Sequence, residues 1–518
     1  MNRPYFLVLA FALVVPSADG SEGEKALPPH AACAAPAGDY VEAALLQRPV
    51  SIVAGVGKVS QKVTTKTPAA QAFYDQGLAY LHSYVWIEAA RSFNQALRED
   101  PDLAMAWMGL ARAEQGLHRD KEAAAAIEKA TSLAPKATES ERRHIALRAQ
   151  QIEAQNAPAD KETQKHDAYK RAIEKAIAAD PSDPELWVLR GNAEEPGPWG
   201  RGQAGGIGAI AYYEAALARS PGHFGAHHYL VHSFENVGRH AEAAAHGKIY
   251  SDAVPRVAHA QHMYGHVLPR LGKWQEALKQ FEKADAIEEA YAREENLRPG
   301  DDWHHVHNLQ LLGYTYLRLG RLDEAEKSFR RAFDTPIRYR QYGWQHATLA
   351  EYLLLRGRPE EALRAAKQLR DRTPGARAAG AAVEGETLLA LGRREEASEA
   401  AKRARKEFQA AKSDAGSDGR WMERFVEPFI QQLEAELALT EKASEDHLLK
   451  LADDLAANPR FDAWGEGLFR LERIAEQAKR SGKESLVRDI HERMRRIDPE
   501  YAPGSTARAR ATTAAVSP

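Results

Sequence analysis

Cysteine is almost absent from this 518-residue chain, which has only Cys33. A single cysteine cannot form an internal disulfide framework. It also cannot supply the several thiolates of a cysteine-based zinc site or the cysteine pair of a c-type haem attachment motif. The folded chain must therefore be held together by packing alone.

Net charge of one sign is lacking as well. The chain has 70 basic and 73 acidic residues, which gives a formal net charge of −3. Nucleic-acid-binding domains gather positive charge on one face, whereas both signs are interleaved here, so we predict no nucleic-acid partner. Beyond the N-terminus no run of residues is apolar enough to cross a bilayer, so we also predict no membrane span.

The N-terminus carries one short apolar run. Arg3 precedes an apolar stretch over residues 5–15, and small residues stand before a possible cleavage point after Gly20. This pattern is typical of a secretory signal peptide. We therefore predict that residues 1–20 are a signal peptide and that the protein is exported, either to the periplasm or out of the cell. Lipidation of Cys33 stays open, because the residues before it match a lipidation motif only in part.

What the sequence does contain is a helical repeat. Ala, Leu, Glu, Lys and Arg are abundant, and from residue 67 small residues, aromatics and prolines recur about every 34 residues. In the clearest unit the recurring positions are Phe73, Gly77, Tyr80, Ala89, Phe93, Ala96 and Pro101. This unit resembles the tetratricopeptide repeat (TPR), whose pattern is W-x2-L-G-x2-Y…A-x3-F…P. The resemblance implies an all-α fold: an α-solenoid of antiparallel helix pairs over residues 67–411.

Segments of different composition flank and interrupt the solenoid. Residues 21–66 have no helical period, which predicts a linker or N-terminal arm. Residues 412–500 are predicted to form a C-terminal helical segment that caps the stack, and residues 501–518 a disordered tail. The glycine-rich stretch 195–206 lacks the GK[ST] ending of a phosphate-binding loop, so we interpret it as an insertion between helices.

Histidine is concentrated in one part of the solenoid, since 12 of the 20 histidines lie between His223 and His307. His228 and His232 are four residues apart, and an equally spaced pair follows one repeat later. That spacing puts both imidazoles of a pair on one helix face. Stacked repeats then place the two pairs side by side.

The resemblance also indicates the direction in which these side chains point. In tetratricopeptide repeats, certain positions of the first helix line the concave groove of the solenoid. The residues of this sequence at those positions, or in the turn before them, are His228, His232, Glu235, His259, His262, His266, His304, His307 and Tyr314. We therefore predict a polar groove here that captures a protein or peptide segment, a small ligand or a metal ion.

Imidazoles and carboxylates on neighbouring helices are the ligands with which helical proteins hold transition metals. We predict a metal site formed by His228, His232, His262, His266 and Glu235. Zinc, iron or copper would suit this ligand set, whereas Mg²⁺ or Ca²⁺ would require more carboxylates.

Two alternatives stay open at this point. The same residues would suit a metal-dependent enzyme, with Glu235 as a ligand or a base, although the sequence contains no GxSxG or HExxH motif. The histidines could also be incidental to a structural scaffold, because a single histidine taken alone is more often structural than a ligand.

Overall fold

The structure, a computed structural model, describes residues 41–497 with the exception of residues 60, 199, 299, 338–341, 415–422, 424, 441–443, 445, 447–448, 451–452 and 454–465. The predicted signal peptide, Cys33 and the C-terminal tail lie outside the described residues. Among the helices that are described, none is long and apolar enough to cross a membrane.

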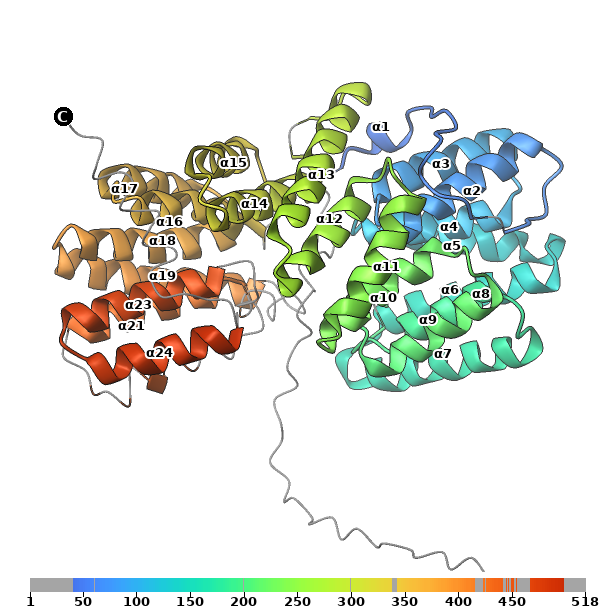
Figure 1. Ribbon diagram of the computed structural model, residues 1–518. Helices are drawn as coiled ribbons and strands as arrows, with labels where there is room; N and C mark the ends of the chain where they lie inside the picture. The colour runs from blue at the N-terminus through green and yellow to red at the C-terminus, as the bar shows by residue number, and fades with distance from the viewer. Residues whose placement is uncertain are drawn as a thin grey trace, which may run out of the picture.

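The described part of the chain is helical and contains no strand (Figure 1). The N-terminal helices are α1 (Ala43–Leu46), α2 (Pro68–His82), α3 (Trp86–Glu99), α4 (Ala104–Gly116), α5 (Asp120–Leu133), α6 (Glu139–Gln155), α7 (Ala159–Ala179), α8 (Pro184–Asn192) and α9 (Ile207–Arg219). The central helices are α10 (Phe224–Asn236), α11 (His240–Ala253), α12 (Ala258–Val267), α13 (Trp274–Glu294), α14 (Trp303–Arg318) and α15 (Leu322–Asp334). The C-terminal helices are α16 (Ala347–Leu355), α17 (Pro359–Gln368), α18 (Pro374–Ala390), α19 (Arg394–Asp414), α21 (Glu427–Thr440), α23 (Glu466–Arg480) and α24 (Glu484–Ile497). Short 3-10 helices are η2 (Ala134–Lys136), η3 (Leu268–Leu271), η4 (Tyr342–His346) and η5 (Leu369–Asp371).

Successive helices pack as pairs, and the pairs stack on one another. From α2 onward each helix packs against the next one in the chain, as α2 does on α3, α10 on α11 and α12 on α13. At the C-terminal end α21 packs on α18 and α19, and α23 on α24. The predicted all-α solenoid of helix pairs is therefore confirmed.

The repeat pattern has a direct packing reason, because its glycines lie against its aromatic rings. A Cβ atom added at Gly77 would lie 2.8 Å from the Phe93 ring, and one at Gly109 would lie 2.4 Å from the same ring. The same contact recurs between Gly313 and Phe329, at 2.6 Å. Only glycine lets the helices come this close around a buried ring.

The first turn of the solenoid closes on itself, which the repeat pattern did not predict. Helix α10 packs against α2, although many residues separate them in the chain. Farther along, Arg91 on α3 forms ion pairs with Glu88 and with Glu295 just after α13, both at 2.6 Å. Tyr291 donates a hydrogen bond to Glu88 at 2.9 Å. The concave side of this turn is therefore enclosed.

Residues 41–66, predicted as a linker or arm, lie against the solenoid where the structure describes them. Val56 and Val63 are buried. The amide of Arg256, ahead of α12, donates to the carbonyl of Gly55 at 3.0 Å. Asn94 on α3 donates to the carbonyl of Leu46 at 3.0 Å. The arm thus joins the first helix pair to the region just before α12.

The interruption over residues 195–206 lies between α8 and α9, as an inter-helix insertion would. The buried Glu195 carboxylate accepts hydrogen bonds from the backbone amides of Arg201 and Ala204, at 3.0 and 2.9 Å. Asn236, at the end of α10, donates to the carbonyls of Gln203 and Gly205 at 2.8 and 2.9 Å. These bonds fix the insertion next to the helix that carries His228 and His232.

Candidate metal centre

The histidines singled out by their spacing gather at the centre of the closed turn. His228, His232, His262 and His266 are each 0% exposed. This differs from the expectation of an open groove, because closure of the turn covers the concave face. Two of the predicted groove residues, His259 and His304, line a cavity.

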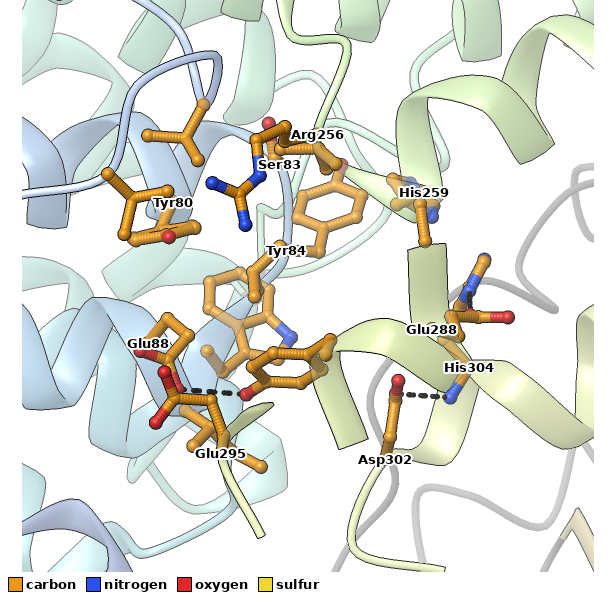
Figure 2. A pocket seen from close by; sticks show the side chains of 18 of the residues that line it. Tyr80, Ser83, Tyr84, Glu88, Arg256, His259, Glu288, Glu295, Asp302 and His304 are labelled. Atoms are coloured by element: carbon orange, nitrogen blue, oxygen red, sulfur yellow. Dashed lines mark hydrogen bonds and ion pairs between the residues drawn. The ribbon is translucent and has the colours of Figure 1, made fainter. Parts of the chain in front are cut away.

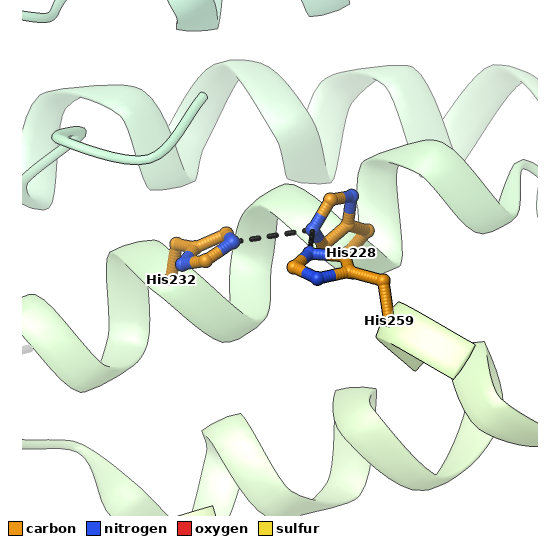
Figure 3. A group of neighbouring side chains, drawn as sticks. All are labelled: His228, His232 and His259. Atoms are coloured by element: carbon orange, nitrogen blue, oxygen red, sulfur yellow. Dashed lines mark hydrogen bonds between the residues drawn. The ribbon is translucent and has the colours of Figure 1, made fainter. Parts of the chain in front are cut away.

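Three of these imidazoles converge on one point (Figure 3). The Nε2 atom of His228 lies 3.1 Å from Nε2 of His232 and 3.1 Å from Nε2 of His259. His228 and His232 come from one face of α10, and His259 comes from the first turn of α12. The i, i+4 spacing on α10 and the stacking of α12 beside it produce this convergence.

The proton on His228 is fixed by the backbone. Its Nδ1 lies 2.6 Å from the carbonyl oxygen of His82, at the end of α2. A carbonyl only accepts, so Nδ1 carries the hydrogen, and in a neutral imidazole Nε2 then carries a lone pair. That lone pair can accept one good hydrogen bond but faces two other nitrogens.

The arrangement has a geometry that could hold a metal ion. Nitrogens bound tetrahedrally to zinc at about 2.0–2.1 Å lie about 3.3 Å apart, close to the observed 3.1 Å separations. The backbone acceptor on His228 Nδ1 is the kind of outer partner that orients metal-binding histidines. Of the three, only His228 has such an acceptor, since Nδ1 of His232 and of His259 have no hydrogen-bond partner among the described residues.

A second group of histidines adjoins the first. The rings of His262 and His304 lie 4.4 Å apart between centroids, and those of His262 and His307 lie 5.0 Å apart. The His259 ring, which belongs to the first group, lies 5.0 Å from that of His304. The two groups therefore form one continuous histidine cluster. We use that name for His228, His232, His259, His262, His266, His304 and His307.

A side chain outside the second group fixes the proton of His262. His262 Nδ1 lies 3.1 Å from Oδ1 of Asn308, and that amide is itself oriented by donating to the carbonyl of Phe281 at 3.1 Å. His262 therefore carries its hydrogen on Nδ1, and its buried Nε2 has no hydrogen-bond partner among the described residues. His304 Nδ1 is hydrogen bonded to Glu288.

Glu235 has a different place from the one predicted. Its Oε1 is hydrogen bonded to Nδ1 of His266 at 2.8 Å, so it orients that histidine instead of joining the converging trio. Tyr314 also differs from its predicted place in the groove, because it is buried against Phe329 with ring centroids 5.2 Å apart. Neither Glu235 nor Tyr314 is therefore one of the groups that converge with His228.

Burial keeps the histidine cluster uncharged. Loss of hydration lowers the pKa of His232 to about 3 and that of His304 to about 4. Burial, and then the neighbouring His232, lowers the pKa of His228 well below its usual value. Neutral imidazole is the form that binds metals, so the cluster has the required charge state at neutral pH.

Sequence reasoning missed two residues that complete the centre, His82 and Tyr84. The Tyr84 ring packs on that of His228 with centroids 4.5 Å apart, and its hydroxyl donates to the carbonyl of Arg201 at 2.6 Å. Tyr84 also has a positive φ of 57°, a backbone conformation that non-glycine residues rarely adopt and that often marks functional sites. Both residues are more than 140 positions from His228 in the sequence, and no local pattern links them to it.

A neighbouring group of His82, Glu185 and His223 also consists of residue types that bind metals. Its side chains, however, are already hydrogen bonded. His223 Nδ1 accepts from the amide of Ala226 at 3.1 Å, so its Nε2 carries the hydrogen and donates to Glu185 at 2.9 Å. The Nε2 atom of His82 lies 3.1 Å from the same carboxylate oxygen. Burial alone would raise the pKa of Glu185, but His82 and His223 hold it well below its usual range. The hydrogen bonds of this group join α2, α8 and the start of α10.

Comparison with known sequences identifies the repeat. Residues 86–138 and residues 306–335 each match a family profile described as a tetratricopeptide repeat. No curated protein matches the chain.

Solved structures of helical-repeat proteins are similar to parts of the chain. Yeast Tom70 is 12% identical, with 85% of this chain and 92% of Tom70 covered and a TM-score of 0.37. A tetratricopeptide repeat protein from Parabacteroides merdae is 15% identical, with 50% of this chain and 93% of that protein covered and a TM-score of 0.34. The protein TTC0263 from Thermus thermophilus is 19% identical, with 39% of this chain and 99% of that protein covered and a TM-score of 0.29.

Proposed function

We propose that this chain, which belongs to the tetratricopeptide repeat family, is a protein-binding scaffold that also holds a transition metal ion within its closed turn. Stacked repeats of this kind present extended surfaces to protein partners. The metal would bind to Nε2 of His228, His232 and His259, and zinc, iron and copper all suit three imidazoles. Export is part of the proposal, and it rests on the signal-like pattern of residues 1–20.

One observation carries the metal proposal. His228 Nε2 has its lone pair fixed by the carbonyl of His82 and faces two further Nε2 atoms at 3.1 Å. Three buried neutral imidazoles arranged in this way have at most one good hydrogen bond between them. A cation at their centre would use all three lone pairs. Zinc bound to three protein ligands keeps a fourth position for water or another ligand.

The test is a metal titration of the mature protein, purified without a histidine tag and treated with a chelator. We expect zinc to bind with a stoichiometry of at least one in calorimetry. Removing a ligand in His232→Ala or His259→Ala should weaken that binding by at least 10- to 100-fold. Loss of a residue that only hydrogen bonds to a metal ligand already weakens metal binding about this much.

His246→Ala is the matched control for these variants. His246 lies on α11 and contacts His227, 2.7 Å between their Nδ1 atoms, outside the converging trio. We expect the control to bind zinc like the unmodified protein. If zinc, iron and copper all failed to bind the unmodified protein, or if His246→Ala weakened binding as much as His259→Ala, the proposed site would be wrong.

Export is tested separately by sequencing the N-terminus of the protein recovered from its native host. We expect the mature chain to begin after residue 20 and to fractionate outside the cytoplasm. Recovery of an intact Met1 terminus in the cytoplasmic fraction would contradict it.

A further inference from the structure

A cavity of about 450 Å³ adjoins the histidine cluster. Its walls come from the arm, from the α2–α3 turn, from the residues just before and at the start of α12, and from the end of α13 with the start of α14. Figure 2 shows His259, Glu288 and His304 along one side, with Tyr80, Glu88 and Glu295 across from them. Pockets that hold small organic molecules have volumes of about 300–1,000 Å³.

The walls of this cavity are mostly apolar. Tyr84 and Trp86 stack with ring centroids 5.3 Å apart and form an aromatic surface. Much of the remaining lining is aliphatic and includes Val50, Val53, Val56, Ile87, Ile287 and Ala290. A passage for hydrated metal ions alone would need neither this volume nor this lining.

Four of the six acidic residues that line the cavity have arginine partners. Glu88 and Glu295 share Arg91 at 2.6 Å each. Asp301 pairs with Arg298 at 3.0 Å, and the exposed Glu294 with Arg256 at 3.2 Å. The cavity therefore does not select a cation by a row of uncompensated carboxylates.

Several buried polar atoms in the wall lack a hydrogen-bond partner among the described residues, and a bound ligand would supply one. Trp86 is 4% exposed, and its Nε1–H has no hydrogen-bond partner among the described residues. The same holds for Oε2 of Glu288 and Nδ1 of His259, both buried in the wall near the cluster. An indole N–H can only donate, and a buried donor without an acceptor is unfavourable.

We propose that this cavity binds a small, mainly apolar organic molecule whose oxygen accepts a hydrogen bond from Nε1–H of Trp86. The aromatic and aliphatic walls hold the apolar body of the molecule. Trp86, Glu288 and His259 contact its polar part.

His259 belongs both to the cavity wall and to the converging trio, so a molecule in the cavity lies next to the metal. This last step rests on the proposed metal site, whereas the cavity site itself does not.

The experiment uses the fluorescent probe 8-anilinonaphthalene-1-sulfonate, which has an apolar aromatic body and acceptor oxygens. We expect the full-length, chelator-treated protein to bind it at one saturable site. Ala290→Trp places a large ring at a half-buried position of α13 that lines the cavity, and should abolish that binding. Trp86→Phe keeps the ring and removes the donor, so it should weaken the affinity about 3- to 10-fold.

Two control variants match these substitutions. Ala292→Trp adds the same ring to α13 at a half-buried position outside the cavity lining. Trp107→Phe removes an indole N–H that is bonded to the Pro101 carbonyl, away from the cavity. Both should bind the probe like the unmodified protein, and circular dichroism should show that all four variants are folded.

The possible outcomes separate the two proposals. If Ala290→Trp and Trp86→Phe bind the probe like the unmodified protein, or if no saturable site is found, the cavity proposal is overturned even where zinc binds normally. Probe binding that Ala290→Trp abolishes supports it even where no metal binds. Added Cu²⁺ should quench the bound probe, and this quenching should be lost in His259→Ala. That result supports a probe position next to the metal. If no variant and not even the unmodified protein binds the probe, but Ala290→Trp takes up zinc more slowly, the cavity serves only as a passage for metal ions. That result would overturn the proposal.

Discussion

At the scale of single residues, the role of a histidine depends on which ring nitrogen carries its proton. A backbone carbonyl fixes this for His228, and the Asn308 side chain fixes it for His262. In both, Nε2 is left as a lone pair facing the interior of the protein. Metal-binding histidines commonly have outer partners of this kind.

The identity of the clustered histidines could be predicted from their spacing, but their partners could not. His228 and His232 share a helix face because they are four residues apart. The acceptor for His228 is the carbonyl of a residue 146 positions earlier, and backbone carbonyls leave no trace in a sequence pattern. His259 was predicted in the groove but not among the metal ligands, because it belongs to neither pair of histidines spaced four residues apart.

A buried histidine outside the cluster gives a prediction about pH. Burial, together with Arg372, lowers the pKa of His346 to about 3. Its Nε2–H donates to the carbonyl of Thr335 at 2.9 Å, and its Nδ1 accepts from Arg372 at 2.6 Å. An unfolded histidine has a pKa of about 6.5, so below that pH the unfolded chain binds a proton that the folded chain does not. The free energy of unfolding therefore falls as the pH decreases from about 6.5 towards 3.

Replacing this residue by His346→Gln should remove that dependence, because the amide can donate to Thr335 and accept from Arg372 in the same places. Between pH 7.5 and pH 5 we expect the variant to lose about 2 kcal/mol less stability than the unmodified protein. Urea unfolding at both pH values measures the difference. An equal loss in the two proteins would show that His346 is not held neutral by burial.

At the scale of helices, the repeat positions explain the packing well. The small residues of the pattern lie against aromatic rings, as Gly77 and Gly109 do on the two sides of Phe93. This is why the pattern predicted helix pairs. The irregular segments were harder to predict, because residues 41–66 and 195–206 are fixed by side chains and amides of distant helices and not by their own periodicity.

This packing predicts the effect of Gly109→Ala. The added methyl group would lie 2.4 Å from the Phe93 ring, and that ring is 0% exposed and cannot move aside. We expect the free energy of unfolding to fall by about 1–3 kcal/mol, measured by urea unfolding. At Gly222 an added methyl group meets nothing within 4 Å, so Gly222→Ala should change stability by less than about 0.5 kcal/mol. Equal effects of the two substitutions would contradict this explanation of the repeat glycines.

At the scale of the whole molecule, closure of the first turn decides where the chemistry lies. Contact of α10 with α2 brings the His82 carbonyl to His228, and the Arg91 ion pairs hold α3 to the end of α13. The repeat pattern predicts that helices stack but not how tightly the superhelix winds. That is why the sequence predicted an open polar groove, while the structure has a buried histidine cluster beside a cavity.

X-ray absorption at the zinc edge of the loaded, untagged protein identifies the ligands of the proposed metal site. We expect nitrogen neighbours at about 2.0–2.1 Å with the scattering signature of imidazole rings, and one fewer imidazole in His259→Ala but not in His246→Ala. A zinc ion surrounded only by oxygen atoms, or an unchanged spectrum in His259→Ala, would contradict it.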